Sequence, residues 1–244
     1  MRPSARLELE SLRSFFAVPE ATGEIREAGR ATAVRADGVA GPPLNRILGL
    51  DDLAVLDELA ELFDGRPFWI ALEPEVGLDQ ELTARGFVPD GAWQRFTRGV
   101  DPFEAETELD IGDARAPGDF AAVVGETWRL PPPAVAWMAG IVEHPAWHCL
   151  VAYDEAKPVA AAALFASGDR GWLGIAATLE SHRGRGAQSA LIAARIRLAS
   201  ELRLRVLVTE TDAPGDGEPV QSFRNVIRAG FEPEYVRANY ASPR

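Results

Sequence analysis

The sequence contains one cysteine, Cys149, and one lysine, Lys157, among its 244 residues. A single cysteine excludes an intrachain disulfide, so we expect a protein of the reducing cytoplasm. No apolar run approaches the roughly 18 residues of a transmembrane helix, and the first residues lack the apolar core of a secretion signal. The three histidines, His144, His148 and His182, do not have the spacing of metal ligands, and we therefore expect no bound metal.

The charge balance is negative, because 37 Asp and Glu residues outnumber 25 Lys and Arg residues and leave a net charge of −12. Such a surplus repels phosphate backbones and anionic lipid headgroups, so we expect neither a nucleic acid nor a membrane as partner. The hydrophobic fraction of 47% and the charged fraction of 25% exclude a disordered, collagen-like or coiled-coil chain. These values are compatible with a monomer or a homodimer.

The length leaves one domain or two open, because a single domain usually has about 150 residues. An acidic segment that begins at Asp101 and includes residues 104–108 has the composition of a linker. We therefore predict two domains, residues 1–105 and residues 106–244.

A short repeat points in the same direction. The hexapeptide Ala84-Arg-Gly-Phe-Val-Pro89 has a counterpart, Arg228-Ala-Gly-Phe-Glu-Pro233, 144 residues later. In both places a predicted helix precedes the hexapeptide and an alternating aromatic run follows it. The repeat indicates either a duplication or a coincidence, since a glycine followed by Phe-x-Pro is an ordinary way to end a helix.

Hydrophobic periodicity predicts strands and helices in alternation. The clearest unit is a strand at residues 171–178, a long helix at 186–202 and a strand at 205–210. Other predicted helices cover residues 7–18, 51–64, 76–85, 117–128, 132–142 and 220–229, and other predicted strands cover 68–72, 93–97, 108–111, 149–153 and 158–165.

The turn between the strand at 171–178 and the long helix contains Arg183-Gly-Arg-Gly186-Ala-Gln188-Ser189. Free main-chain N–H groups and the helix dipole make such a turn an anion site, and its glycines allow a diphosphate to approach closely. The alternative is a solvated helix start with two exposed arginines. The turn lacks the Gly-Lys-Ser/Thr of a Walker A loop and the third glycine of a dinucleotide fingerprint, so neither ATP nor NAD is expected.

This turn resembles the acetyl-CoA motif of the Gcn5-related N-acetyltransferase (GNAT) superfamily, Arg/Gln-x-x-Gly-x-Gly/Ala at a strand-to-helix junction. The match fails only at Gln188, where the family has a small residue. The strand at 206–210 and the segment 222–231 resemble the later motifs of the family in order and spacing. The resemblance covers residues 171–240.

The resemblance implies an α/β (α+β) fold of two acetyltransferase-like domains, each with a mixed, mostly antiparallel central sheet flanked by helices. The first domain has the Gly86-Phe87 ending of the family but no phosphate-binding turn. Its glycine-rich candidate, residues 38–43, contains prolines, which lack N–H donors. We therefore interpret residues 1–105 as a degenerate copy that covers or shapes the acceptor site.

The resemblance also implies an acetyl-CoA-dependent N-acetyltransferase, in which the amine of a small molecule attacks directly in a ternary complex. The diphosphate would bind the turn, and pantetheine would pair with the strand that precedes it. The implied acetyl-CoA-binding residues are Ala176, Ala177, Thr178, Arg183, Gly184, Arg185, Gly186, Ala187, Gln188, Ser189 and Asn225. On this interpretation, Gly186→Asp would abolish binding and leave the fold intact.

The catalytic residues are less well defined. In many members of the family, a tyrosine four positions before Gly-Phe acts as the general acid. This chain has Val226 at that position. Tyr235, Tyr240 or Ser222 is then the candidate acid, and Glu210, at the end of a strand, is the candidate base. Each has a structural alternative: Tyr235 as strand packing, and Glu210 as a solvated strand end. The missing tyrosine leaves a second function open, a non-catalytic acyl-CoA-binding regulatory module.

Two features concern the acceptor. Trp128, Trp137 and Trp147 either pack in the core or form an aromatic wall of the acceptor site. The first 105 residues have a net charge of −8 and the remainder −4, which favours a cationic acceptor, although a solvated acidic surface explains the difference equally well.

Overall fold

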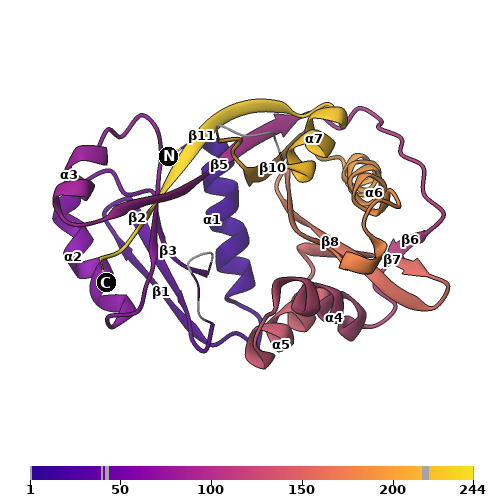
Figure 1. Ribbon diagram of the computed structural model, residues 1–244, viewed down its shortest axis with the longest axis horizontal. Helices are drawn as coiled ribbons and strands as arrows, with labels where there is room; N and C mark the ends of the chain where they lie inside the picture. Colours follow the sequence, from indigo (N-terminus) through magenta and orange to yellow (C-terminus); the bar gives the residue numbers. More distant parts are fainter. Residues whose placement is uncertain (1, 40, 42–43, 216–219, 244) are drawn as a thin grey trace.

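An 11-stranded sheet extends through the molecule, with helices on both faces (Figure 1). The computed structural model describes residues 2–39, 41, 44–215 and 220–243. The strand order is β1-β2-β3-β4-β11-β5-β10-β9-β8-β7-β6. Neighbouring strands are antiparallel except in the pairs β3–β4 and β9–β10, which are parallel. The mixed, mostly antiparallel sheet flanked by helices is therefore confirmed.

The strands are β1 (Gly23–Ala28), β2 (Ala31–Ala36), β3 (Asn45–Leu48), β4 (Trp69–Leu72), β5 (Val88–Arg98), β6 (Asp110–Asp113), β7 (Trp147–Asp154), β8 (Lys157–Ser167), β9 (Arg170–Thr178), β10 (Val206–Asp212) and β11 (Glu232–Ala241). The helices are α1 (Pro3–Phe15), α2 (Leu56–Ala60), α3 (Asp79–Ala84), α4 (Pro117–Trp128), α5 (Pro132–Gly140), α6 (Ala187–Glu201) and α7 (Gln221–Arg228), with 3-10 turns η2 (Leu53–Val55), η3 (Glu61–Phe63), η4 (Ile141–Glu143) and η5 (Glu180–His182). No helix in the described part of the chain is long and apolar enough to cross a membrane.

The two halves of the chain repeat one topology. In the first half, β1, β2 and β3 form an antiparallel meander, and β4 is parallel to β3. In the second half, β7, β8 and β9 form the same meander, and β10 is parallel to β9. Helix α3 and strand β5 follow β4, just as α7 and β11 follow β10. The two Gly-Phe hexapeptides thus occupy equivalent places.

The halves exchange their last strands. Strand β5 pairs with β10 of the second half, and β11 returns to pair with β4 of the first half. The two exchanged strands also pair with each other, so one sheet continues from β1 to β6 where the resemblance implied a sheet in each domain. Residues 1–105 and 106–244 remain our proposed domains, but neither has a complete sheet by itself.

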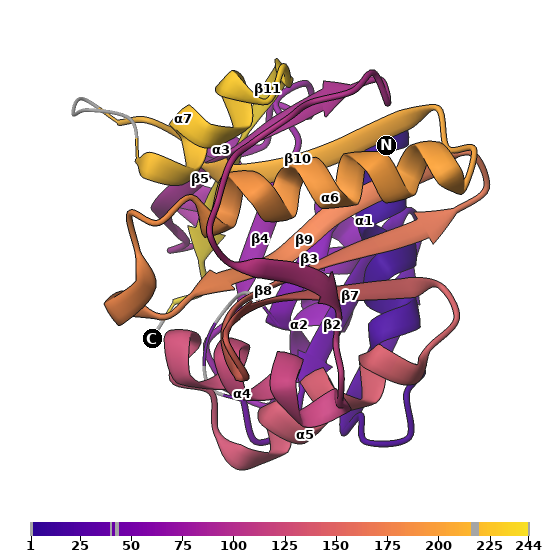
Figure 2. The ribbon, with the colours of Figure 1, turned by 90° about the vertical axis from the view of Figure 1, so that its right-hand side faces the viewer.

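The helices divide between the two faces of the sheet. Helix α1 lies at the centre of Figure 1 and packs with α4 and α5 on one face, where Phe15 stacks on Trp137 with ring centroids 4.8 Å apart. Helix α6 covers β8 and β9 on the opposite face, as Figure 2 shows, and α7 lies beside it. Residues of α1 and of β2–β4 also form a small shared core. Helix α1 is therefore the element that joins the two halves on the face of α4 and α5.

Sequence periodicity predicts no element for residues 19–50, where the structure has β1, β2 and β3. Strand β2 is buried almost throughout, so its apolar residues do not alternate with polar ones. Strand β1 is polar and mostly exposed at the edge of the sheet. The predicted helix at 51–64 is broken into η2, α2 and η3. Pairing between distant segments, which periodicity does not report, determines this region.

Candidate active site

Strands β9 and β10 separate in the middle of the sheet. Their parallel pairing runs from Arg170 and Val206 to Leu173 and Thr209 and ends there. Beyond Leu173, Ile175 and Ala176 stand opposite the single residue Ala162 of β8, which is a β-bulge. The edge of β9 that faces β10 is thus without a strand partner at the place where the sequence predicts pantetheine pairing.

The bulge is strained. Ile175 has a backbone φ of 48°, in the left-handed region that β-branched residues avoid. Such a conformation costs about 1–3 kcal/mol, and it persists only where the surrounding structure enforces it. Strained residues of this kind concentrate at functional sites, and Ile175 lines a cavity.

This cavity has a volume of about 590 Å³ and lies where β9 and β10 separate. It reaches α6 and α7 on one face of the sheet and α1 on the other. Lining residues on the side of α6 and α7 include Ala176, Gln188, Ile192, Arg195, Ser222, Val226 and Phe231, and those on the side of α1 include Leu12, Phe15, Arg46, Trp93, Trp147 and Trp172. Both halves of the chain thus contribute to one site.

The turn before α6 presents unpaired donors. Gly184 and Gly186 have φ values of 81° and 79°, and α6 begins at Ala187. Within the described part of the chain, the backbone N–H groups of residues 184–189 have no hydrogen-bond acceptor. These N–H groups and the positive end of the α6 dipole are the features of an anion site, and diphosphate binding at this turn remains a prediction.

The side chains around the turn differ from the simple sequence interpretation. Arg185 forms an ion pair with Asp154 at 2.6 Å, so its charge is already paired with a carboxylate of the protein. A Cβ atom at Gly186 would lie 2.6 Å from the carbonyl oxygen of Glu106 in the linker. Gly186 therefore makes room for the linker, and Gly186→Asp would disturb the fold, contrary to the sequence-based expectation. The roles of Arg183, Gly184 and Arg185 in acetyl-CoA binding remain predictions.

Gln188 and Asn225 connect α6 with α7. The Asn225 Nδ2 group donates to Gln188 Oε1 at 2.7 Å, and Gln221 Nε2 donates to Asn225 Oδ1 at 2.8 Å. Asn225 is buried and bonds to these side chains, whereas the sequence suggests CoA or backbone capping. The glutamine at the divergent motif position therefore holds α7 against the first turn of α6.

The catalytic candidates do not converge. Glu210 and Ser222 line the cavity, and so does Val226, which replaces the tyrosine of many relatives. Tyr235 lies outside the cavity lining, where its hydroxyl donates to Glu73 Oε1 at 3.3 Å. The position of Tyr235 favours its structural alternative. Ala176 lines the cavity, while Ala177 and Thr178 lie further along β9.

A buried ionic cluster, which we define as Glu8, Arg46, Arg95, Arg237 and Glu210, lies beside the cavity. Glu8 in α1 is fully buried and contacts all three arginines, with Arg46 Nη2 at 2.8 Å. Arg95 and Arg237 also contact Glu210 Oε2, at 3.1 and 3.3 Å. Sequence reasoning missed all of these residues except Glu210, because they come from α1, β3, β5, β10 and β11 and share no local motif.

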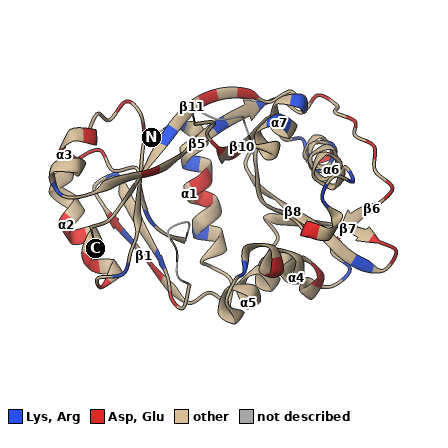
Figure 3. Cartoon of the chain, viewed as in Figure 1, with Lys and Arg blue, Asp and Glu red and all other residues tan. Residues whose placement is uncertain are grey.

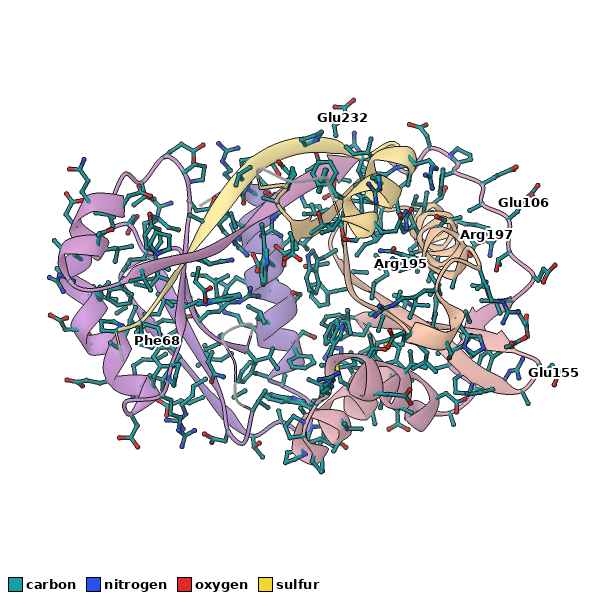
Figure 4. All side chains as sticks on the ribbon, in the orientation of Figure 1. Phe68, Glu106, Glu155, Arg195, Arg197 and Glu232 are labelled. Carbon is teal, nitrogen blue, oxygen red and sulfur yellow. The ribbon has the colours of Figure 1, made fainter. Side chains whose placement is uncertain are left out.

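One more buried arginine lines the cavity. Arg195 of α6 is 2% exposed and has no carboxylate partner among the described residues. Its Nε and Nη1 groups donate to the carbonyl oxygens of Leu191 and Ala163. Burial lowers its pKa to about 9. Figure 4 shows Arg195 on the inner side of α6 and Arg197 on the outer side, so α6 places a cation in the interior.

The tryptophans have different roles. Trp137 is buried and its indole N–H donates to the carbonyl oxygen of Phe15, so it packs in the core. Trp128 and Trp147 line the cavity, together with Trp93 and Trp172. Among the described residues, no cluster of histidine, cysteine and carboxylate side chains is suited to hold a metal ion.

Gly174 keeps the Trp172 ring in place. A Cβ atom at Gly174 would lie 2.3 Å from two carbon atoms of this ring. Gly174→Ala is therefore expected to displace Trp172, to change the tryptophan fluorescence and to destabilise the fold by about 1–3 kcal/mol, which urea unfolding measures. The control is Gly112→Ala in β6, where an added Cβ meets no atom within 4 Å. Equal spectra and stability for both variants would contradict this expectation.

Comparison with known proteins gives one family. Residues 119–218 match the acetyltransferase (GNAT) family. A GCN5-related N-acetyltransferase from Kribbella flavida superimposes with a TM-score of 0.72 at 18% identity, over 100% of this chain and 97% of that one. A GCN5-related N-acetyltransferase from Sphaerobacter thermophilus superimposes with a TM-score of 0.65 at 16% identity, over 96% of this chain and 84% of that one. A tandem GNAT protein from the clavulanic acid biosynthesis pathway superimposes with a TM-score of 0.62 at 18% identity, over 96% of this chain and 86% of that one. No curated protein sequence matches the chain.

Proposed function

We propose that the protein uses acetyl-CoA to acetylate the amine of a small molecule, because its residues 119–218 match the acetyltransferase (GNAT) family. The observation that carries this proposal is the continuity of two features. The free N–H groups of residues 184–189 lie at the N-terminus of α6. Gln188, in the first turn of this helix, lines the cavity between β9 and β10. If the diphosphate of acetyl-CoA binds at this turn, the thioester end of the same molecule can therefore enter the cavity.

The residues present fit acetyl-CoA. The unpaired N–H groups of the turn suit a diphosphate, and the free edge of β9 at Ala176 suits the amides of pantetheine. When bound, acetyl-CoA would supply the acetyl group as a thioester. The free backbone N–H groups of β9 would stabilise the negative charge that develops on the carbonyl oxygen.

Glu210 is the proposed proton acceptor. Its Oε2 atom is bound by Arg95 and Arg237, while its Oε1 atom has no hydrogen-bond partner among the described residues. The carboxylate faces the cavity at the place where β10 leaves β9. It can take the proton of the acceptor amine directly or through one water molecule. Ser222, which lines the cavity from α7, is the proposed donor to the leaving thiolate.

The first half of the chain would form the acceptor side of the site. Ser11, Leu12, Phe15, Arg46 and Trp93 line the cavity and all lie within residues 1–105. This half repeats the topology of the second, but the described glycines between β3 and β4, Gly49 and Gly65, lie far apart in the sequence, unlike Gly184 and Gly186, and do not directly precede a long helix. We therefore propose that it is a degenerate copy that shapes the acceptor site.

Two measurements test the function. Calorimetry should show 1:1 binding of acetyl-CoA, and an acceptor screen that detects the released CoA thiol should identify amines that are turned over. Absence of acetyl-CoA binding would refute the proposal. Tight binding without turnover of any amine would support the non-catalytic module, which the valine at position 226 favours.

A further inference from the structure

We propose that the acceptor carries a carboxylate next to its amine, and that it is an amino acid with an aromatic body. The inference rests on the proposed function, because the acceptor side of the same cavity is its site. Arg46 would bind the carboxylate and Glu210 would face the amine. Three observations, on the charge, the hydrogen bonds and the walls of this site, support the assignment.

The buried ionic cluster contains one more cation than it has anions. Arg46, Arg95 and Arg237 form ion pairs with Glu8 and Glu210 and with no other carboxylate among the described residues. Glu73 lies outside the cluster; burial raises its pKa, and the charges of Arg237 and Arg95 oppose this shift. An uncompensated charge in a buried place is costly, and a bound anion removes that cost.

Arg46 is the cluster member with unused donors at the cavity. It is 4% exposed and lines the cavity from β3. Its Nη2 group is bound to Glu8, but its Nε and Nη1 groups are buried without a hydrogen-bond partner. Buried donors of this kind are rare because each costs free energy, so they indicate a missing partner. A carboxylate is the partner that a guanidinium group binds best.

The position of Arg46 favours the alternative in which the acidic residues of the first half form a solvated surface. The acidic residues of α2 and α3 lie on outer helices, as Figure 3 shows. Among the described residues of 1–105 that line the cavity, Arg46 is the only charged one. On the other half, Glu210, Asp212 and Arg195 line the cavity. The acceptor side therefore offers a cation and carboxylates together, which suits a zwitterion.

Arg46 and Glu210 are also neighbours. Arg46 contacts Glu8, Glu8 contacts Arg237, and Arg237 contacts Glu210, all within one cluster. Because both residues line the same cavity, we place the carboxylate of the acceptor at Arg46 and its amine at Glu210. The cavity also has aromatic lining residues, among them Trp93 and Trp147. Such walls suit an aromatic side chain, which stacks on tryptophan.

The test compares matched acceptors with the unmodified protein. CoA-thiol release is measured with L-tryptophan against tryptamine and with L-phenylalanine against phenethylamine. We expect kcat/KM to be about 10- to 100-fold higher for each amino acid, the worth of one charged hydrogen bond. The inference would be wrong if the decarboxylated amines were acetylated as fast as the amino acids or faster, or if every amine that is acetylated lacked a carboxylate. Either result would leave the proposed function standing. Absence of acetyl-CoA binding would overturn the proposed function itself.

A variant assigns the preference to Arg46. Arg46→Gln should reduce the ratio of the two kcat/KM values towards one, mainly by raising KM for the amino acid, and Arg46→Lys should restore part of it. Arg30→Gln, at an exposed arginine paired with Asp51, is the matched control and should keep the ratio. A ratio that Arg46→Gln leaves unchanged would overturn the assignment. If this variant does not fold, the comparison of acceptors with the unmodified protein still decides.

Discussion

Glu8→Gln is expected to lower the free energy of unfolding by about 3–5 kcal/mol, the usual loss when one partner of a buried ion pair is removed. Glu8 is 0% exposed and is the one carboxylate that contacts Arg46, Arg95 and Arg237 together among the described residues. Glutamine fills the same space but has no charge. Arg95 and Arg237 would then share Glu210, and Arg46 would have no carboxylate partner among the described residues.

The effect of Glu8→Gln should depend on pH. Burial by itself would raise the pKa of Glu8, but the charges of Arg237, Arg95 and Arg46 lower it below its ordinary value. A carboxyl group with a lowered pKa stabilises the fold fully above the unfolded pKa of about 4.3 and loses this contribution as the pH falls. Below about pH 5, unfolding free energy should therefore fall more steeply in the unmodified protein than in the variant.

The control for this prediction is Glu10→Gln on the same helix. Glu10 is partly exposed, pairs with Arg6, and accepts a hydrogen bond from Ser167 that a glutamine can also accept. Its loss should be below about 1 kcal/mol. Urea unfolding between pH 3 and pH 8 measures both variants. Similar losses for Glu8→Gln and Glu10→Gln would show that the cluster does not stabilise the fold.

Gln188→Glu is expected to weaken acetyl-CoA binding about ten- to hundredfold, or 1–3 kcal/mol, without weakening the fold. The new carboxylate would stand in the first turn of α6, next to the free N–H groups proposed to bind the diphosphate. It can still accept the hydrogen bond from Asn225. An acid in the first turn also suits the helix dipole, so loss of binding would not result from unfolding.

The control is Gln188→Ala, which removes the side chain but adds no charge. It should change the dissociation constant much less, because only the contact with Asn225 is lost. Calorimetry with acetyl-CoA at low and at physiological salt measures both variants, and salt should reduce the effect of the glutamate. An unchanged affinity in Gln188→Glu would place the diphosphate away from the start of α6.

The glycine turn illustrates what local sequence can predict. The start of α6 and the strand before it depend on neighbours along the chain. The sequence of residues 171–189 therefore predicts the strand, the turn and the helix start, and it also predicts an anion site there. Even here the packing of Gly186 escaped prediction, because the carbonyl group that it faces belongs to Glu106, 80 residues earlier in the chain. The role of a glycine thus depends on a neighbour that spacing does not reveal.

The residues of the cluster show the opposite case. Arg46, Arg95 and Arg237 each stand in a strand with no motif around them, and β3 itself was not predicted. Their proximity results from the strand exchange, in which β5 and β11 cross between the halves and bring their arginines to Glu8 and Glu210. Pairing between strands far apart in the sequence has no local signal.

The sequence by itself therefore determined the acidic composition, the repeat, most helices and the glycine turn before α6, because each of these depends on residue types and short spacings. Only the tertiary structure decided how the halves share one sheet, which side chains face the cavity, and that Tyr235 lies outside its lining while Arg46 lies within it. Those outcomes depend on long-range pairing and on which buried charges need partners, and no short segment of the chain contains that information.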